Sequence, residues 1–191
     1  MTREPAKQAK DKNLKVTCTS TDCKNNLHCF KLTQKLRKTL APGQCRTCGI
    51  DLVDFKRIFR RDVGDLKYTF KCLKYEMIRH HYWHVTIPER ALRLASRKGL
   101  AGLKEAVTQR IKTAIGTARP FMDGRQTPRE TSKSVTIIHL GQHATATCCR
   151  KCVEYWHGIP QGRPLTDAEI AYLSNLIMMY VIDRMPDLRL Q

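Results

Sequence analysis

The sequence predicts a mainly α-helical protein: a compact helical domain with small zinc-stapled turns and at most one short strand. Apolar residues recur at helical spacing in most segments after residue 50, which is typical of helices with one buried face. Two capping-box patterns mark helix starts. The nine cysteines fall largely into clusters. Clustered thiols in a chain without an apolar export signal favour zinc over disulfides, so we expect a cytoplasmic protein with no disulfide-linked partner.

We divide the chain into three parts: a flexible basic tail (1–15), a zinc module with four cysteine ligands (16–60), and a helical domain with a second Cys/His cluster (61–191). Within the zinc module, apolar residues at positions 32, 36 and 40 predict a helix. Asp51 is expected to cap a second, short helix.

The helical domain begins with a pattern that starts at Asp65 and runs on into Arg79–His84. Thr86–Glu89 has the form of a capping box and opens a helix that stops at Gly99. Another helix follows, with its apolar face running from Leu103 to Ile115.

The remaining elements lie after residue 116. Residues 117–134 are polar and rich in turn formers, which predicts a surface loop. Val135–Leu140 is short and β-branched, and we expect either a buried strand or an extended entry segment. A second capping box, Thr166–Glu169, opens a final helix that ends near Pro186.

Charge narrows the choice of partner. The chain contains 35 Lys and Arg against 17 Asp and Glu, a net charge of +18. Residues 1–120 contain 27 against 10, whereas residues 121–191 contain 8 against 7. A regional excess of positive charge favours nucleic acid as the partner, with a solvated surface as the plain alternative. No stretch reaches the roughly 18 apolar residues that a membrane span needs, and we expect no membrane partner.

The first thiol cluster predicts a structural zinc site. Two cysteine pairs on turns can supply four thiolates to one ion, and the predicted ligands are Cys18, Cys23, Cys45 and Cys48. Gly49 allows the second turn to close. His28 is a spare ligand that could replace Cys18 or Cys23, and Cys29 is a further spare.

The second cluster predicts a second possible zinc ion, held by His143, Cys149, Cys152 and His157. Cys148 competes with Cys149, and spacing does not choose between them. The surplus of ligands leaves room for chemistry, and His143 and Cys148 are the candidate catalytic residues, with Arg150 and Lys151 able to lower a thiol pKa.

A third feature is Arg79–His84, which places two histidines one helical turn apart. Such a pair could bind a metal or grip a phosphate, and the neighbouring aromatic rings could stack on unpaired bases or simply pack in the core. The predicted nucleic-acid contacts are Arg57, Arg60, Arg61, Lys71, Lys74, Arg79, His80, Trp83 and His84.

Residues 108–184 resemble a small bacterial domain family whose function is not established. The matching stretches are Asp123–Pro128, Gln142–Cys152, Trp156–Gly162 and the final helix from Leu165. The resemblance implies that His143, Cys148, Cys149, Cys152, Trp156 and His157 form one site. The chain departs from the family at residues 129–134, and the N-terminal cysteine region is an addition.

The segment Cys149–His157 also resembles the zinc-binding half of His-Asn-His-type nucleases. That resemblance implies that Cys45 and Cys48 share one zinc ion with Cys149 and Cys152, and that His139 or His143 activates water. The leading hypothesis is a zinc-stabilised protein that binds nucleic acid, DNA rather than RNA, in DNA processing, repair or defence. The alternatives are a metal-dependent hydrolase acting on nucleic acid, and a protein-interaction module held together by zinc.

Overall fold

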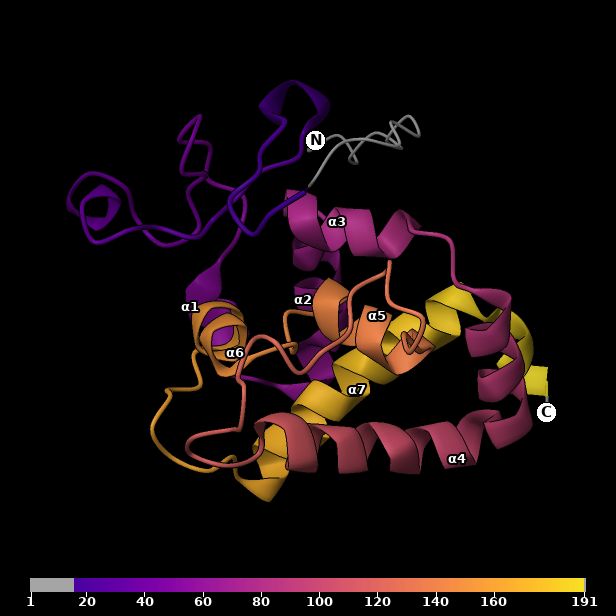
Figure 1. The fold of residues 1–191 in the computed structure, drawn as a ribbon. Helices are drawn as coiled ribbons and strands as arrows, with labels where there is room; N and C mark the ends of the chain where they lie inside the picture. The colour runs from indigo at the N-terminus through magenta and orange to yellow at the C-terminus, as the bar shows by residue number, and fades with distance from the viewer. Residues whose placement is uncertain (1–15, 191) are drawn as a thin grey trace.

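The computed structural model describes residues 16–190, and within this range the chain is mainly helical and forms no β-sheet (Figure 1). The predicted helical class is therefore confirmed. The predicted basic tail, residues 1–15, lies outside the described residues. None of the described helices is both long enough and apolar enough to span a membrane.

The helices form one packed body with an irregular segment, residues 16–54, at one end (Figure 1). The longest helix, α4, packs against α5 and α7, and α5 also packs against α3. The α-helices of the described range are α1 (Phe55–Phe59), α2 (Leu66–Leu73), α3 (Met77–His84), α4 (Glu89–Ile115), α5 (Ile137–Ala144), α6 (Arg150–His157) and α7 (Asp167–Arg184).

The helix expected over residues 32–40 does not form. Only a short 3-10 turn, Leu36–Lys38, appears there, and the three apolar residues of the pattern are half-buried. Because most helical stability in proteins comes from packing an apolar face, a face without a partner surface does not hold a helix. The next helix, α1, is capped by Asp54 rather than by Asp51, and the Asp54 side chain accepts from the Arg57 N–H.

The pattern that began at Asp65 is broken into α2 and α3 by residues 74–76. The backbone between α2 and α3 is hydrogen-bonded to the irregular segment. His28 donates its backbone N–H to Tyr75 O at 2.8 Å, and Met77 donates its backbone N–H to His28 O at the same distance. These two bonds tie the irregular segment to the helical body.

Gly99 interrupts α4 as the sequence predicted, with non-helical φ 62° and ψ 179°. The two expected capping boxes differ in outcome. Thr166 and Glu169 form theirs at the start of α7, whereas α4 begins after Pro88 without a side-chain cap, so Thr86 forms none.

The strand or extended segment expected at Val135–Leu140 is wrong, because α5 begins at Ile137. A short apolar run has the same composition in a buried strand and in a buried helix. Here Thr136 caps the helix by accepting from the His139 N–H. Gly141 lies against α7, where an added Cβ would meet Tyr180 at 3.0 Å, so α5 packs closely on α7.

One hydrophobic core extends from Val16 to Leu188. Trp156 of α6 is fully buried, and its ring lies 6.0 Å from that of Phe30 and 5.3 Å from that of Phe55. The predicted zinc module (16–60) and the predicted helical domain (61–191) therefore contribute to the same hydrophobic core.

Candidate metal centres and basic groove

Two groups of side chains could each hold a metal ion, and their thiol and imidazole ligands suit zinc. We call them the N-terminal cluster (Cys23, His28, Cys45 and Cys48) and the C-terminal cluster (Cys148, Cys149 and Cys152). In each cluster the candidate ligand atoms lie within 4.8 Å of one another. All nine cysteines are free thiols.

The N-terminal cluster has the dimensions of a zinc site. Zinc–sulfur bonds of about 2.3 Å in a tetrahedron separate two sulfurs by about 3.8 Å, and a sulfur from an imidazole nitrogen by about 3.6 Å. The Cys23 and Cys45 sulfurs are 3.8 Å apart, and the Cys48 sulfur is 3.6 Å from His28 Nδ1. The cluster is therefore arranged for an ion at its centre.

Local structure orients each ligand of the N-terminal cluster. His28 Nε2 donates to Asn26 Oδ1 at 2.8 Å, which leaves Nδ1 as the ligating nitrogen. The Thr47 N–H donates to the Cys45 sulfur at 3.4 Å. Burial opposes ionisation of Cys45, but hydrogen bonds from His28 and from backbone groups outweigh it and lower the Cys45 pKa to about 5. A thiolate is thus favoured where a metal ligand is needed.

The membership of this cluster differs from the principal prediction by one residue. The structure brings Cys23, Cys45 and Cys48 together, with His28 as the fourth ligand and not Cys18. His28 was the expected spare. Cys29 is buried nearby and donates its thiol to Cys18 O at 3.4 Å, so it is not part of the cluster.

The C-terminal cluster lies where α6 begins. Cys149 caps α6, and its sulfur accepts from the Cys152 N–H at 3.4 Å. Cys148 and Cys152 are buried. Of the predicted ligand set, Cys149 and Cys152 are brought together, and Cys148 joins them instead of competing with Cys149.

The two histidines of the predicted second set are engaged elsewhere. His157 Nε2 donates to Thr145 O at 3.0 Å, and its Nδ1 accepts from the Tyr172 hydroxyl at 3.3 Å. His143 donates Nε2 to Pro128 O at 3.2 Å and stacks on Tyr82 at 4.4 Å. Burial lowers the pKa of both histidines to about 4, so both are neutral at pH 7.

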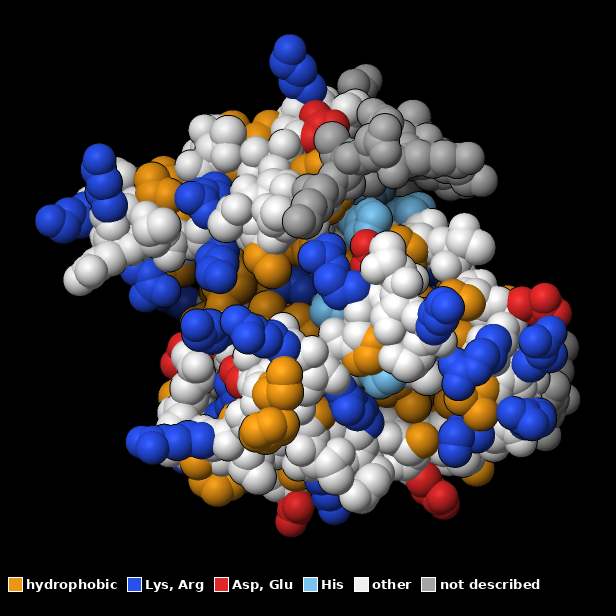
Figure 2. Space-filling view, in the orientation of Figure 1, with side chains coloured by type: hydrophobic (Ala, Val, Ile, Leu, Met, Phe, Trp, Pro, Cys, Tyr) orange, Lys and Arg blue, Asp and Glu red, His pale blue; other side chains and the backbone are white. Residues whose placement is uncertain are grey.

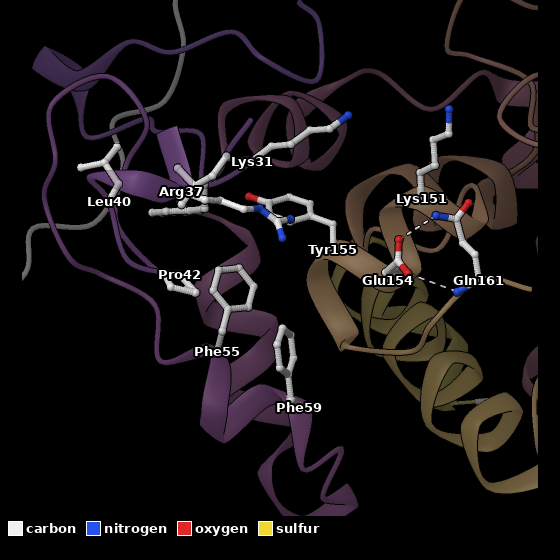
Figure 3. A pocket seen from close by; sticks show the side chains of 12 residues that line it. Lys31, Arg37, Leu40, Pro42, Phe55, Phe59, Lys151, Glu154, Tyr155 and Gln161 are labelled. Atoms are coloured by element: carbon white, nitrogen blue, oxygen red, sulfur yellow. Dashed lines mark hydrogen bonds between the residues drawn. The ribbon is translucent and has the colours of Figure 1, made fainter. Parts of the chain in front are cut away.

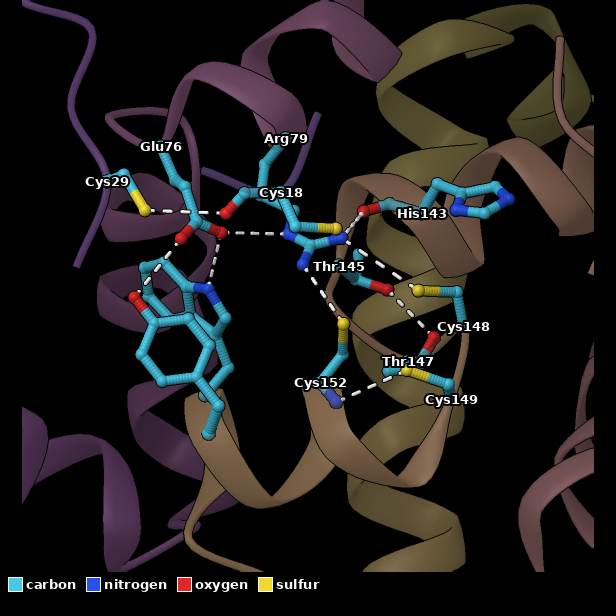
Figure 4. Close-up of polar contacts among 12 residues, drawn as sticks. Cys18, Cys29, Glu76, Arg79, His143, Thr145, Thr147, Cys148, Cys149 and Cys152 are labelled. Atoms are coloured by element: carbon cyan, nitrogen blue, oxygen red, sulfur yellow. Dashed lines mark hydrogen bonds and ion pairs between the residues drawn. The ribbon is translucent and has the colours of Figure 1, made fainter. Parts of the chain in front are cut away.

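A buried ion pair lies beside the C-terminal cluster (Figure 4). Arg79 Nε donates to Glu76 at 3.0 Å, and the two side chains are only 2% and 1% exposed. The Arg79 guanidinium also donates to His143 O at 2.6 Å and to the Cys152 sulfur at 3.3 Å. Burial opposes the charge on Arg79, but the Cys152 thiolate and Glu76 raise its pKa well above its usual value. Arg79 therefore remains a cation in the interior.

Glu76 is a residue that the sequence analysis missed. Its carboxylate accepts from Trp156 Nε1 at 2.7 Å and from the Tyr155 hydroxyl at 3.1 Å. It therefore joins α6 to α3 through one buried group. No spacing pattern marks such a residue, because its partners lie about 80 positions away along the chain.

The predicted nucleic-acid contacts separate into three groups by position. Arg60, Lys71 and His84 are exposed. Three are partly buried and already contact other protein groups. Arg57 forms an ion pair with Asp65, Lys74 forms one with Asp183, and Arg61 donates to the carbonyl groups of His157 and Gly158. Three are buried and unable to reach a phosphate: Arg79, His80 and Trp83.

A groove of about 760 Å³ lies between residues 30–42 on one side and α1 and α6 on the other (Figure 3). Its floor is apolar and its rim carries cations, and Figure 2 shows orange side chains in a hollow edged by blue ones. The rim cations are Lys31, Arg37 and Lys151, and the aromatic lining includes Phe55, Phe59 and Tyr155. Neither His143 nor Cys148 lines this groove.

The fold and the clusters define a mainly helical protein with two groups of residues suited to metal binding. The chain belongs to the family described as "Domain of unknown function (DUF4186)", whose model matches residues 67–182. The match contains the C-terminal cluster and lies wholly after the N-terminal cluster. No solved structure matches the chain. In the structure the pairs Cys45/Cys48 and Cys149/Cys152 lie in separate clusters, unlike the shared site that the nuclease resemblance implies.

Proposed function

We propose that this protein binds nucleic acid, with DNA as the preferred ligand, and that the groove is its binding surface. The observation that carries the proposal is the combination of the exposed Phe59 ring and several cations in one groove. A positively charged groove with stacking rings is typical of proteins that bind unpaired strands. A role in DNA processing, repair or defence follows from this preference, and the nine free thiols fit a reducing, cytoplasmic setting.

The charge around the groove supports the proposal. Residues 23–50 contain six Lys and Arg and no Asp or Glu. The rim cations Lys31, Arg37 and Lys151 are exposed, and they take part in none of the ion pairs found among residues 16–190. The one acidic lining residue, Glu154, accepts two hydrogen bonds from Gln161. The rim is therefore free to contact phosphates.

The aromatic rings form a continuous series along the groove. The Phe55 ring lies 5.4 Å from that of Phe59 and 5.8 Å from that of Tyr155. Phe59 is 37% exposed, although it is a large apolar side chain. An exposed ring next to cations can stack on a base while the cations hold the backbone.

Each candidate metal cluster adjoins one wall of the groove. Residues 30–42 lie between two candidate ligands of the N-terminal cluster, His28 and Cys45, and Cys149 of the C-terminal cluster caps α6. A metal ion in each cluster would fix these two walls. A binding surface of this kind benefits from rigid support.

Fluorescence anisotropy with the zinc-loaded full chain tests the proposal. The probes are a short labelled single-stranded DNA, the same sequence as RNA, and the corresponding DNA duplex. Phe59→Ala should weaken binding of the single-stranded DNA about 10-fold, or about 1.4 kcal/mol, the scale of one base stacked on a ring. Phe121→Ala is the matched control, because Phe121 is 85% exposed and lies outside the groove.

Two variants that each remove one positive charge, one inside the groove and one outside it, complete the test. Lys31→Gln should reduce the slope of log affinity against log salt by about 0.7 on a single strand, whereas Lys133→Gln should leave it unchanged. Tighter binding of RNA than of DNA would overturn the choice of DNA. Equal affinities for Phe59→Ala and Phe121→Ala, or binding that salt does not weaken, would overturn the groove proposal and leave a protein-interaction module.

A further inference from the structure

A group of three thiols lies beside the buried Arg79, and Cys18, from a distant part of the sequence, approaches the same place. The three thiols are the C-terminal cluster, whose sulfurs lie within 4.8 Å of one another. Cys18 lies about 130 residues earlier in the chain. Figure 4 shows the Cys18 side chain at the Arg79 guanidinium, on the same side as Cys152, and its thiol is within hydrogen-bonding reach of Cys152.

We propose that Cys18, Cys148, Cys149 and Cys152 form a four-thiolate zinc site that fastens the N-terminal segment to α6. Four sulfur ligands in a closed arrangement are typical of a structural zinc ion. On binding, the thiols release their protons to solvent and zinc takes four thiolates. The chain would then hold two zinc ions, one in each cluster, with no ligand shared between them.

Cys152 is the centre of this group. Its sulfur lies within 4.8 Å of the sulfurs of Cys148 and Cys149, and it also interacts with the Cys18 thiol. Arg79 donates to the Cys152 sulfur at 3.3 Å and to the Cys148 sulfur at 3.9 Å, which favours negatively charged sulfur at both positions. A buried cation that donates to ligand sulfurs is an outer-shell partner of the kind that metal sites use.

No other described side chain competes for the fourth position. Both ring nitrogens of His157 already have partners, and His143 is stacked on Tyr82 with Nε2 bonded to a carbonyl. Cys29 donates to the carbonyl group of Cys18, and so holds the backbone of the fourth ligand in place.

The neighbouring contacts indicate what the site would do. Arg129 donates to Val16 O at 3.2 Å, so residues 16–18 already lie against the helical body. Zinc on Cys18 and α6 would close a loop of about 130 residues. Binding to the folded state alone would raise the stability of that state and reduce opening of the N-terminal segment.

Metal content measures the proposal directly. The full chain, purified under reducing conditions with zinc, should contain two zinc ions per chain by mass spectrometry of the metal. Cys18→Ala should retain one tight zinc ion and weaken the other more than the about 10–100-fold typical of losing an outer-shell partner. Cys18→Ala combined with Cys23→Ala should retain no tight zinc.

Cys72→Ala is the matched control, because Cys72 is a buried thiol of α2 outside both clusters; it should keep both ions. Cobalt substitution gives a second readout, since loss of Cys18 should reduce the sulfur-to-cobalt charge-transfer absorption in proportion to one lost thiolate. Two zinc ions of unchanged affinity in Cys18→Ala would overturn the role of Cys18. A single zinc ion in the unaltered chain that survives Cys149→Ala would overturn the site as a whole.

Discussion

The buried pair Glu76–Arg79 should be the most sensitive polar contact in this protein. Glu76→Gln keeps the shape of the side chain but removes its charge. It leaves Arg79 charged and 98% enclosed, with a neutral acceptor in place of a carboxylate. Breaking a buried pair by removing one partner costs about 3–5 kcal/mol, because the remaining charge loses its carboxylate partner in the interior.

The magnitude is large compared with total stability. Domains are stable by about 5–15 kcal/mol, and for a chain of this size each 1 kcal/mol shifts Tm by about 2–4 °C. Glu76→Gln should therefore lower Tm by about 6–20 °C. The same carboxylate also accepts from Trp156 and Tyr155, and a glutamine has only one oxygen for these donors.

Urea unfolding of the zinc-loaded protein, followed by far-UV circular dichroism, measures the cost. Glu89→Gln is the control, since Glu89 pairs with Arg93 on the exposed face of α4 and its side chain is 79% exposed. Pairs of this kind contribute about 0.3–0.5 kcal/mol. A cost below about 1 kcal/mol for Glu76→Gln would refute the argument, because it would mean that no ion pair exists in the interior.

Three further outcomes follow from single residues. Burial lowers the pKa of His157 to about 4 in the folded chain. As the pH falls, this histidine therefore binds a proton in the unfolded chain before it does so in the folded chain. Stability should then drop between pH 6.5 and 4 by up to about 1.4 kcal/mol per unit, and equal pH slopes for His157→Gln and the unaltered chain would contradict this. Thr166→Ala should cost about 1 kcal/mol through its lost helix cap, whereas Thr86→Ala, where no cap forms, should cost nearly nothing in the same unfolding assay. Gly158→Ala should cost at least about 1–2 kcal/mol, since φ is +63° and the new Cβ would lie 2.6 Å from the Phe59 ring; an unchanged Tm would exclude this clash.

Local features of the chain were predictable. The helical class, the interruption at Gly99 and the cap at Thr166 depend on residues within one or two helical turns, and all three are present. The failures have a common cause. The helix expected over residues 32–40 lacks a surface to pack on, and Val135–Leu140 became helical where Gly141 lets α5 approach α7.

The sequence by itself determined which residue types were available as metal ligands, since clustered thiols and imidazoles are typical of metal sites. Only the tertiary structure decided how these ligands are grouped: His28 with the N-terminal cluster, and Cys18 beside the C-terminal one. The structure also placed Arg79 in the interior and brought the rim cations to Phe59. Spacing along a chain constrains neighbours within about two turns, whereas ligand grouping, burial and grooves depend on segments that meet only after the core has formed.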